Sequence, residues 1–230
     1  MKLTNNCLGL FIFIVTISIF SNSCKKDDNN TTITVKDIDG NVYHTVTIGT
    51  QTWMVENLKT TKYNDSTAIT YAKGMTDWGT LSASNYCWYD NDIANKDIYG
   101  ALYNWNAINN TKLCPIGWHL PTDADWTILI AFLGGESVAG NKLKESGTIH
   151  WLNPNTEANN NTGFTAVPGG SRSNYGTFNG LGNNGIWWSS SLCECSSFFA
   201  WTWGLNFETG KVDRVTSFKE TGVSVRCIKD

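Results

Sequence analysis

The sequence has little charge and no cluster of charge of one sign. Charged residues make up 16% of the 230 positions, and the formal net charge at pH 7 is -3. No block of lysine and arginine interrupts the chain. Because proteins that hold nucleic acid present a basic patch to its phosphates, we expect no nucleic-acid partner.

Proline is scarce as well, with four residues, whereas glycine reaches 21 and tryptophan 11. Aromatic residues make up 13% of the chain. Much glycine and aromatic character with little charge is typical of a compact, loop-rich extracytoplasmic domain and argues against a helical bundle. The length fits one domain with additional segments, since domains commonly hold roughly 100–200 residues.

An apolar run long enough to cross a bilayer is also missing, but a shorter run lies near the N-terminus. Residues 8–20 read LGLFIFIVTISIF and follow Lys2. A transmembrane helix needs about 20 apolar residues, so we predict a signal peptide over residues 1–23. Cys24 is placed like the acylated cysteine of a bacterial lipoprotein, although Ser21 stands where such sites usually have an aliphatic residue. The alternative is an ordinary signal peptide followed by a cysteine without lipid.

Residues 24–32 are predicted to form a flexible tether. After Cys24 they read KKDDNNTT, a polar segment with nothing to bury. The basic-then-acidic start of this segment resembles the export signal that many lipoproteins of the Bacteroidetes group carry after their acylated cysteine. That resemblance implies a protein held by its lipid on the outer face of the outer membrane, with the membrane as its partner.

The remaining residues, 33–230, are predicted to form one domain without internal repeats. Residues 33–35 and 42–48 are β-rich runs on either side of an Asp-Gly pair, which predicts a hairpin. The aromatic run at 100–108 fits a strand or a helix, and its short length does not decide between them.

Toward the C-terminus, several β-rich runs alternate with turn residues. The runs are IWWSSS, FFAWTWGLNF, KVDRVTSF and GVSVRCIKD, with ETGK (208–211) as one of the turns. This pattern predicts an antiparallel meander. The preceding GLGNNG (180–185) matches the dinucleotide-binding pattern, but a strand follows it where that site requires a helix, so we predict no dinucleotide cofactor.

The stretch CPIGWHLPTDADW (114–126) brings together a cysteine, a histidine and two aspartates, as a catalytic or metal site would. Thr122 is placed as a helix N-cap, with Asp125 three residues further on, as in a capping box. Apolar residues then recur at the spacing of one buried helix face until a Gly-Gly pair. We therefore predict one main helix near residues 122–133, no catalytic or metal site, and His119 as a packed residue.

Seven motifs follow one another between residues 37 and 227. They are DIDGNVYHTVTIGTQTWMVENLKTTKYND (37–65), YGALYNWNAI (99–108), KLCPIGWHLPTDADW (112–126), GNKLKES (140–146), GFTAVPGGSR (163–172), GIWWSSS (185–191) and GVSVRC (222–227). Together they closely resemble the Fibrobacter succinogenes major paralogous domain of secreted and lipid-anchored bacterial proteins, whose biochemical role is largely undefined. HLPTDADW, PGGSR and SVRC are also similar to the core of the formylglycine-generating enzyme superfamily, a variant of the C-type lectin fold. Both resemblances imply an α+β, C-type lectin-like domain that is rich in loops and has antiparallel strands.

Five cysteines lie in the predicted domain, an odd number for an oxidising compartment. The family resemblance implies a disulfide between Cys114 and Cys227. Its loop of over a hundred residues would contribute roughly 4–5 kcal/mol in the loop-entropy treatment. The alternative is that both are reduced and buried. Cys193 and Cys195 are too close in sequence to pair easily with each other, so either could pair with Cys87.

The sequence favours a non-catalytic binding or adhesion domain on the cell surface, with a glycan or a protein as its ligand. Trp187, Trp188 and Tyr175 offer flat rings of the kind that stack on sugars, and Arg172 can supply hydrogen bonds. The competing interpretation is packing, since about half of the aromatic residues in alternating strands face the core.

Two other functions fit the same residues. One is a copper-dependent oxidase related to the formylglycine-generating enzyme, with Cys193 and Cys195 as its thiols, but the chain does not reproduce that enzyme's cysteine spacing. The other is a purely structural role at the cell surface. We expect neither an enzyme nor a cofactor. Residues 90–92 (DND) and 153–155 (NPN) carry the oxygen ligands that calcium prefers, but an ion needs about six to eight arranged in space, which spacing alone does not show, so no calcium site is predicted.

Overall fold

The structure, a computed structural model, describes residues 33–78 and 83–230. The predicted signal peptide, the lipidation site Cys24 and the tether lie outside the described residues. From Ile33 onward, the described residues form one contact unit. No helix in this part of the chain combines the length and the apolar character needed to span a bilayer.

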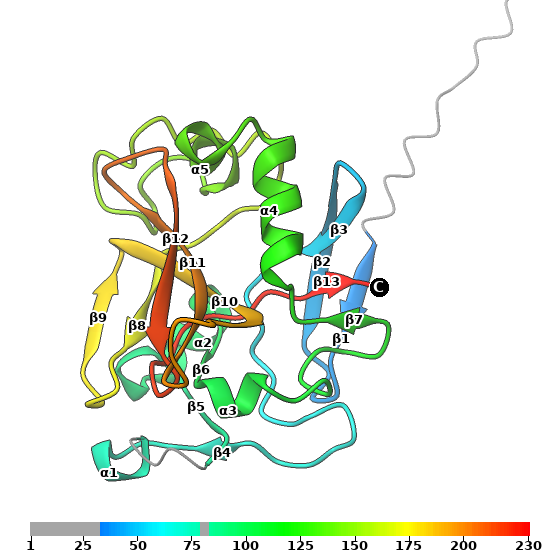
Figure 1. Cartoon of the computed structure of the whole chain (residues 1–230), viewed down its shortest axis with the longest axis vertical. Helices are drawn as coiled ribbons and strands as arrows, with labels where there is room; N and C mark the ends of the chain where they lie inside the picture. The colour runs from blue at the N-terminus through cyan, green and yellow to red at the C-terminus, as the bar shows by residue number, and fades with distance from the viewer. Residues whose placement is uncertain (1–32, 79–82) are drawn as a thin grey trace, which may run out of the picture. The chain divides into compact units, whose positions relative to one another are not determined.

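Short strands and few helices make up this unit (Figure 1). The strands are β1 (Thr34–Lys36), β2 (Val42–Ile48), β3 (Gln51–Met54), β4 (Thr70–Tyr71), β5 (Asn85–Cys87), β6 (Leu102–Tyr103), β7 (Trp118–His119), β8 (Gly169–Arg172), β9 (Phe178–Leu181), β10 (Asn184–Leu192), β11 (Phe199–Asn206), β12 (Val212–Phe218) and β13 (Ile228–Lys229). The helices are α1 (Met75–Trp78), α2 (Lys96–Tyr99), α3 (Trp105–Ile108), α4 (Asp123–Phe132) and α5 (Glu136–Leu143), with the 3-10 helices η1 (Tyr89–Asn91) and η2 (Ile93–Asn95).

The strands form four small sheets. Their orders are β1-β2-β3-β13-β7, β10-β11-β12, β4-β5-β6 and β8-β9. Within these sheets every pairing is antiparallel except that of β4 with β5. The described chain is therefore a mixed α+β domain with mainly antiparallel strands, as the sequence predicts. The undecided run at 100–108 supplies both a strand, β6, and a helix, α3.

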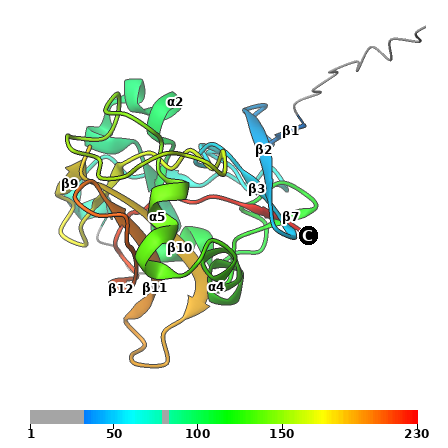
Figure 2. The same cartoon turned by 90° about the horizontal axis from the view of Figure 1, so that it is seen from above.

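Helix α4 confirms the main helix predicted near residues 122–133. The Thr122 hydroxyl accepts a hydrogen bond from the backbone N–H of Asp125, and the Asp125 carboxylate accepts one from Thr122 N, which completes the capping box. Its apolar face carries Trp126 into a core cluster that also holds Trp53 of β3 and Trp203 of β11. Figures 1 and 2 both show α4 standing between the meander and the five-stranded sheet, so the helix packs the two sheets against each other.

The meander β10-β11-β12 is confirmed, with the ETGK turn between β11 and β12. The prediction that GVSVRCIKD forms a strand is wrong over most of its length, since only β13, Ile228–Lys229, is regular strand. The reason is that this segment divides its backbone bonds among several partners. Val223 exchanges bonds with Tyr103 of β6, Ser224 bonds to β10, and the carbonyl of Cys227 accepts from Met54 of β3. Gly222 also exchanges bonds with Arg172 of β8, so the segment joins all four sheets instead of extending one.

Three cations are fully buried in the domain, and each is held by backbone carbonyl groups. Lys144 Nζ donates to the carbonyls of Thr156, Asn206 and Thr209 at 2.9–3.2 Å. Arg172 donates to four carbonyls, among them those of three successive residues, 72–74, in the loop before α1. Arg226 donates to the carbonyls of residues 164 and 165. Because loops have few ladder bonds of their own, these cations satisfy carbonyls that would otherwise be buried without a donor.

The structure has the disulfide that the family resemblance implies, between Cys114 and Cys227, with a Cα–Cα distance of 6.0 Å. The expectation for the other cysteines is wrong. Cys193 and Cys195 are bonded to each other, and Cys87 is free. The physical reason is burial: Cys87 lies with no exposed surface in a separate apolar cluster beside Trp78 and Leu102, while the loop that carries Cys195 is exposed.

Candidate functional site

Three of the four residues predicted to bind a ligand lie in the interior. Trp187, Trp188 and Arg172 are each at most 1% exposed. The two tryptophans point to opposite faces of β10, and a core cluster covers each face. Their indole N–H groups donate to the Asn57 side chain and to the carbonyl of Tyr103. The binding prediction is wrong for these three residues. The covered tryptophan rings offer no face to a sugar, and the buried Arg172 cannot reach a ligand.

Tyr175 is the fourth predicted residue, and its side chain is 74% exposed. It lies in the turn between β8 and β9, where Ser173 N donates to the carbonyl of Thr177. The buried Arg172 precedes this turn and is directed inward to the carbonyls near α1, so the two residues do not share a site. Tyr175 alone remains accessible to a ligand.

A groove of about 380 Å³ is lined by residues of α4, α5 and the meander strands β11 and β12. We call it the α4 groove. Its lining residues are Asp123, Thr127, Ile130, Ala131, Gly135, Glu136, Trp203 and Arg214. The aliphatic residues and the edge of one indole give it an apolar floor, and charged groups stand at its rim.

Asp123 connects the helix to the sheet at one end of the α4 groove. Its Oδ1 atom accepts hydrogen bonds from Trp203 Nε1 at 3.1 Å and from Arg214 Nε at 2.8 Å. Its backbone N–H donates to the Ser191 hydroxyl at 3.0 Å. The sequence indicates this residue only as an acid in the first helical turn, so its contacts with β11 and β12 are a second role that depends on the tertiary fold.

Arg214 lies across the face of Trp201, with its guanidinium carbon 3.4 Å from the ring centre. Cross-strand pairing explains this contact, since Arg214 is opposite Trp203 in the β11–β12 register and diagonal to Trp201. The Arg214 side chain is 34% exposed and that of Asp123 is 23% exposed. The stacked ring and the ion pair therefore fix the guanidinium at the water-exposed rim.

Several polar atoms of the α4 groove are left for a ligand. Among the described residues, Asp123 Oδ2, the two Nη groups of Arg214 and the carboxylate of Glu136 have no hydrogen-bond partner. Donors and acceptors thus stand side by side over an apolar floor. This combination can bind a neutral polar molecule that has one apolar face.

A second hollow of about 300 Å³ lies beside the Cys114–Cys227 disulfide. His119 lines it, and its ring nitrogens face Asp230 Oδ1 at 2.7 Å and Asp125 Oδ2 at 3.5 Å. Ser190 also lines it but donates to the carbonyl of Pro121. Because both nitrogens face carboxylates, the histidine is not placed to activate the serine hydroxyl. His119 is thus hydrogen-bonded, but with its side chain 41% exposed it is not the packed residue that the sequence predicts.

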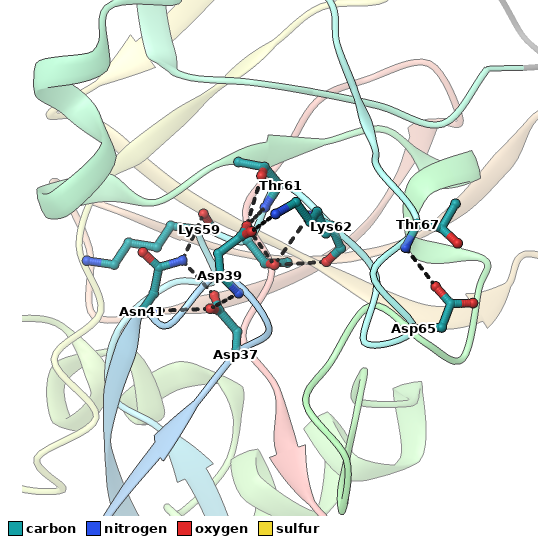
Figure 3. Close-up of polar contacts among 9 residues, drawn as sticks. Asp37, Asp39, Asn41, Lys59, Thr61, Lys62, Asp65 and Thr67 are labelled. Atoms are coloured by element: carbon teal, nitrogen blue, oxygen red, sulfur yellow. Dashed lines mark hydrogen bonds and ion pairs between the residues drawn. The ribbon is translucent and has the colours of Figure 1, made fainter.

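The acidic turn after β1 is a closed network (Figure 3). Asp37 accepts from the backbone N–H groups of residues 39 and 41, from the Asn41 amide and from the Tyr43 hydroxyl. Asp39 accepts from the hydroxyl and backbone N–H of Thr61 and pairs with Lys62. Within residues 33–78 and 83–230, no group of three or more His, Cys, Asp or Glu side chains is arranged to hold a metal ion.

The Cys87 thiol is the only free thiol among the described residues, and we expect it to be inert. Burial raises its pKa from 9.0 to about 12. At pH 8 the native protein should therefore resist alkylation, while the urea-unfolded chain should react fully, which mass spectrometry of tryptic peptides would measure. An engineered thiol at exposed Glu208, E208C, is the control and should react in both states.

The same pKa shift predicts a pH dependence of stability. Since the protonated thiol is favoured in the folded state, its stabilising contribution is complete below about pH 9 and declines as the pH rises toward 12. Urea unfolding between pH 9 and 12 should show a steeper decline in the wild type than in Cys87→Ala, in which buried tyrosines whose pKa is also raised, such as Tyr43 and Tyr103, still contribute a decline. Rapid alkylation of native Cys87 at pH 8 would contradict both expectations.

The fold and the site together define a mixed α+β, disulfide-bonded domain with mainly antiparallel strands and an open polar groove. The chain belongs to the family described as the Fibrobacter succinogenes major domain, whose family model matches residues 46–229. The matched range begins within β2, so β1 precedes it. Comparison with curated proteins and with solved structures gave no match.

Proposed function

We propose that this protein is a lipid-anchored protein of the outer-membrane surface whose domain binds a glycan in the α4 groove without catalysing a reaction. The observation that carries the proposal is the arrangement of Arg214, which lines the groove, is stacked on Trp201, is paired with Asp123 through Nε and is 34% exposed. We also propose that the fold is C-type lectin-like and related to the formylglycine-generating enzyme. The mixed α+β composition and the antiparallel strands support that relation.

The chemistry of the α4 groove fits a sugar better than an ion. Sugars present hydroxyl groups around a ring with apolar C–H faces, so they need paired donors and acceptors beside an apolar surface. Asp123 and Glu136 carry two negative charges against one positive charge on Arg214. Because an acidic sugar would face this excess of carboxylate, we expect a neutral glycan.

We predict that Arg214→Ala lowers glycan affinity at least about tenfold, since a hydrogen bond to a charged group contributes about 1.5–3 kcal/mol. The domain, residues 33–230, would first be screened on a glycan array, and the affinity for the best neutral glycan would be measured by calorimetry. Lys112→Ala is the matched control, because it removes an exposed cation that pairs with Asp65 outside the groove.

Two results would contradict the proposal. If Tyr175→Ala abolished binding while Arg214→Ala left it unchanged, the ligand would lie at the β8–β9 turn and not in the α4 groove. If the arrays were blank, a protein ligand or a structural role at the cell surface would become the better explanation.

The copper-dependent oxidase receives less support from the arrangement of the sulfur atoms. Cys193 and Cys195 are joined to each other, so the two thiols that this alternative needs are not free. The free Cys87 is buried at a different place in the fold. Turnover of a cysteine-containing peptide by the copper-loaded protein would favour the oxidase and overturn the proposal of a non-catalytic domain.

A further inference from the structure

Two exposed isoleucines from distant parts of the sequence border one hollow. Ile38 lies in the β1–β2 turn and is 44% exposed, and Ile116 lies in the loop before β7 and is 86% exposed. The hollow between them measures about 220 Å³, and Val35 and Pro115 are also part of its lining. We call these four residues the isoleucine face. Exposed isoleucine is common, but two such side chains beside further apolar surface form a patch.

The turn that carries Ile38 is held rigidly from both sides. Its neighbour Asp37 accepts four hydrogen bonds from within the hairpin, including one from the Tyr43 hydroxyl. Its other neighbour, Asp39, fastens the turn to Thr61 and Lys62, as Figure 3 shows. The isoleucine is therefore presented to water by a fixed backbone.

The turn that carries Ile116 is fixed in a similar way. Trp118 N donates to the carbonyl of Pro115 across the turn, and Gly117 adopts a φ of 80° that favours glycine. The residue before the turn, Cys114, is tied to β13 by the disulfide, and its carbonyl accepts from Asn64. Neither isoleucine needs to lose much freedom on contact with an apolar surface, which favours binding.

The charges around the isoleucine face do not oppose a lipid surface. The Asp39 carboxylate pairs with Lys62, and Asp65 pairs with Lys112 at 2.7 Å. Asp37 is buried and engaged in the hairpin. Lys36 lines the hollow, is exposed and has no ion-pair partner among the described residues. One exposed carboxylate, that of Asp230, lies near the Ile116 turn, where its backbone N–H donates to the carbonyl of Gly117, and its Oδ1 lies 2.7 Å from His119 Nδ1. Lys36 offsets this charge and can attract anionic headgroups.

The length of chain before the domain favours the lipid bilayer as the surface that the isoleucine face contacts. Eight residues, 25–32, separate the proposed anchor Cys24 from Ile33, so the distance from Cys24 to Ile33 is at most about 30 Å when the chain is fully extended. Ile38 is five residues further along, which adds at most about 17 Å within a strand. A domain on so short a connection stays near the membrane, and its effective concentration there is high.

We propose that the isoleucine face docks on the membrane surface, with Ile38 and Ile116 in contact with lipid and Lys36 near the headgroups. This inference rests on the proposed lipid anchor at Cys24. Docking would fix the orientation of the domain relative to the membrane. The α4 groove would then keep one orientation relative to the bilayer.

The test uses the full chain, expressed with its signal peptide, purified with its lipid and reconstituted into phosphatidylcholine vesicles containing phosphatidylglycerol. Ile116→Cys would carry an environment-sensitive fluorophore, since the buried Cys87 should not react. The matched control places the same label at the exposed Glu208 in the turn between β11 and β12, E208C. We expect the emission at position 116 to shift to shorter wavelength and to be quenched by brominated lipid, and the emission at 208 to do neither.

A second variant distinguishes contact with lipid from contact within the protein. Ile38→Ser in the labelled Ile116→Cys chain should reduce both the shift and the quenching, while the circular dichroism spectrum stays unchanged. A label at 116 that behaves like the one at 208, on protein whose Cys24 is acylated by mass spectrometry, would overturn the docking and leave the anchor intact. Protein without an acyl group on Cys24 would overturn the anchor and, with it, the docking.

Discussion

Replacing Cys114 and Cys227 together by alanine is expected to lower the free energy of unfolding by roughly 4–5 kcal/mol. The two residues are 113 positions apart, so the bond closes a long loop and removes many conformations of the unfolded chain. Both sulfurs are buried, at 2% and 0% exposure, so their removal also leaves unfilled volume in the core. Urea unfolding followed by tryptophan fluorescence would measure the loss.

The second disulfide provides the control for this prediction. Cys193 and Cys195 are only two positions apart, so the same loop-entropy relation gives no more than about 1.5 kcal/mol for their replacement by serine. The comparison separates loop closure from the general effect of removing a disulfide. Equal losses from the two double variants, or a loss below about 1 kcal/mol for Cys114 and Cys227, would contradict the loop-closure explanation.

The long disulfide also matters for the candidate sites. Cys114 precedes the turn that presents Ile116, and Cys227 precedes the short strand β13, which pairs with β3 and β7. The bond therefore secures the isoleucine face to the centre of the five-stranded sheet. In a domain with such short strands, few ladder bonds are available for that purpose.

Local patterns were enough to predict the helix and the meander. The capping box at Thr122 and the apolar spacing after it involve only neighbouring residues, and the ETGK turn determines which residues of β11 and β12 face each other. From that register, the contact of Arg214 with Trp201 could also be inferred, although nothing in the sequence favours it over other cross-strand contacts. The burial of Trp187 and Trp188 was not accessible, because it depends on which elements cover the two faces of β10.

The buried cations were not predictable for the same reason. Lys144 is followed by Glu145, and Arg226 lies four residues before Asp230, but those acids contact His150 and His119 instead. Each cation finds acceptors that are distant in the chain. Arg172 lies in the glycine-rich PGGSR motif, which the sequence suggests is an exposed loop that can contact a ligand. In the structure the arginine instead closes that loop onto the segment before α1. In this loop-rich domain, long cationic side chains thus bond backbone carbonyls that in a regular sheet would be bonded to a neighbouring strand.

Arg226→Met is expected to lower the free energy of unfolding by about 4 kcal/mol, because it removes the donor to the carbonyls of Phe164 and Thr165, whereas Asn57 Oδ1 keeps its bond from Trp187. The guanidinium donates to the carbonyls of Phe164 and Thr165 and to Asn57 Oδ1, and it lies 4.2 Å from the centre of the Phe164 ring. Each unsatisfied buried acceptor costs about 1–3 kcal/mol, and methionine fills the volume without replacing the hydrogen bonds. Urea unfolding would measure the loss.

Arg214→Met is the matched control, since that arginine is partly exposed and its ion pair with Asp123 should contribute about 1 kcal/mol or less. Arg226→Lys should fall between the wild type and Arg226→Met, because an ammonium keeps the charge but cannot reach all three acceptors in the guanidinium's fork geometry. If Arg226→Met were as stable as Arg214→Met, the carbonyls around position 226 would be satisfied in another way, for instance by water that enters the core. The buried cations would then be tolerated by the fold and would not be what holds its loops together.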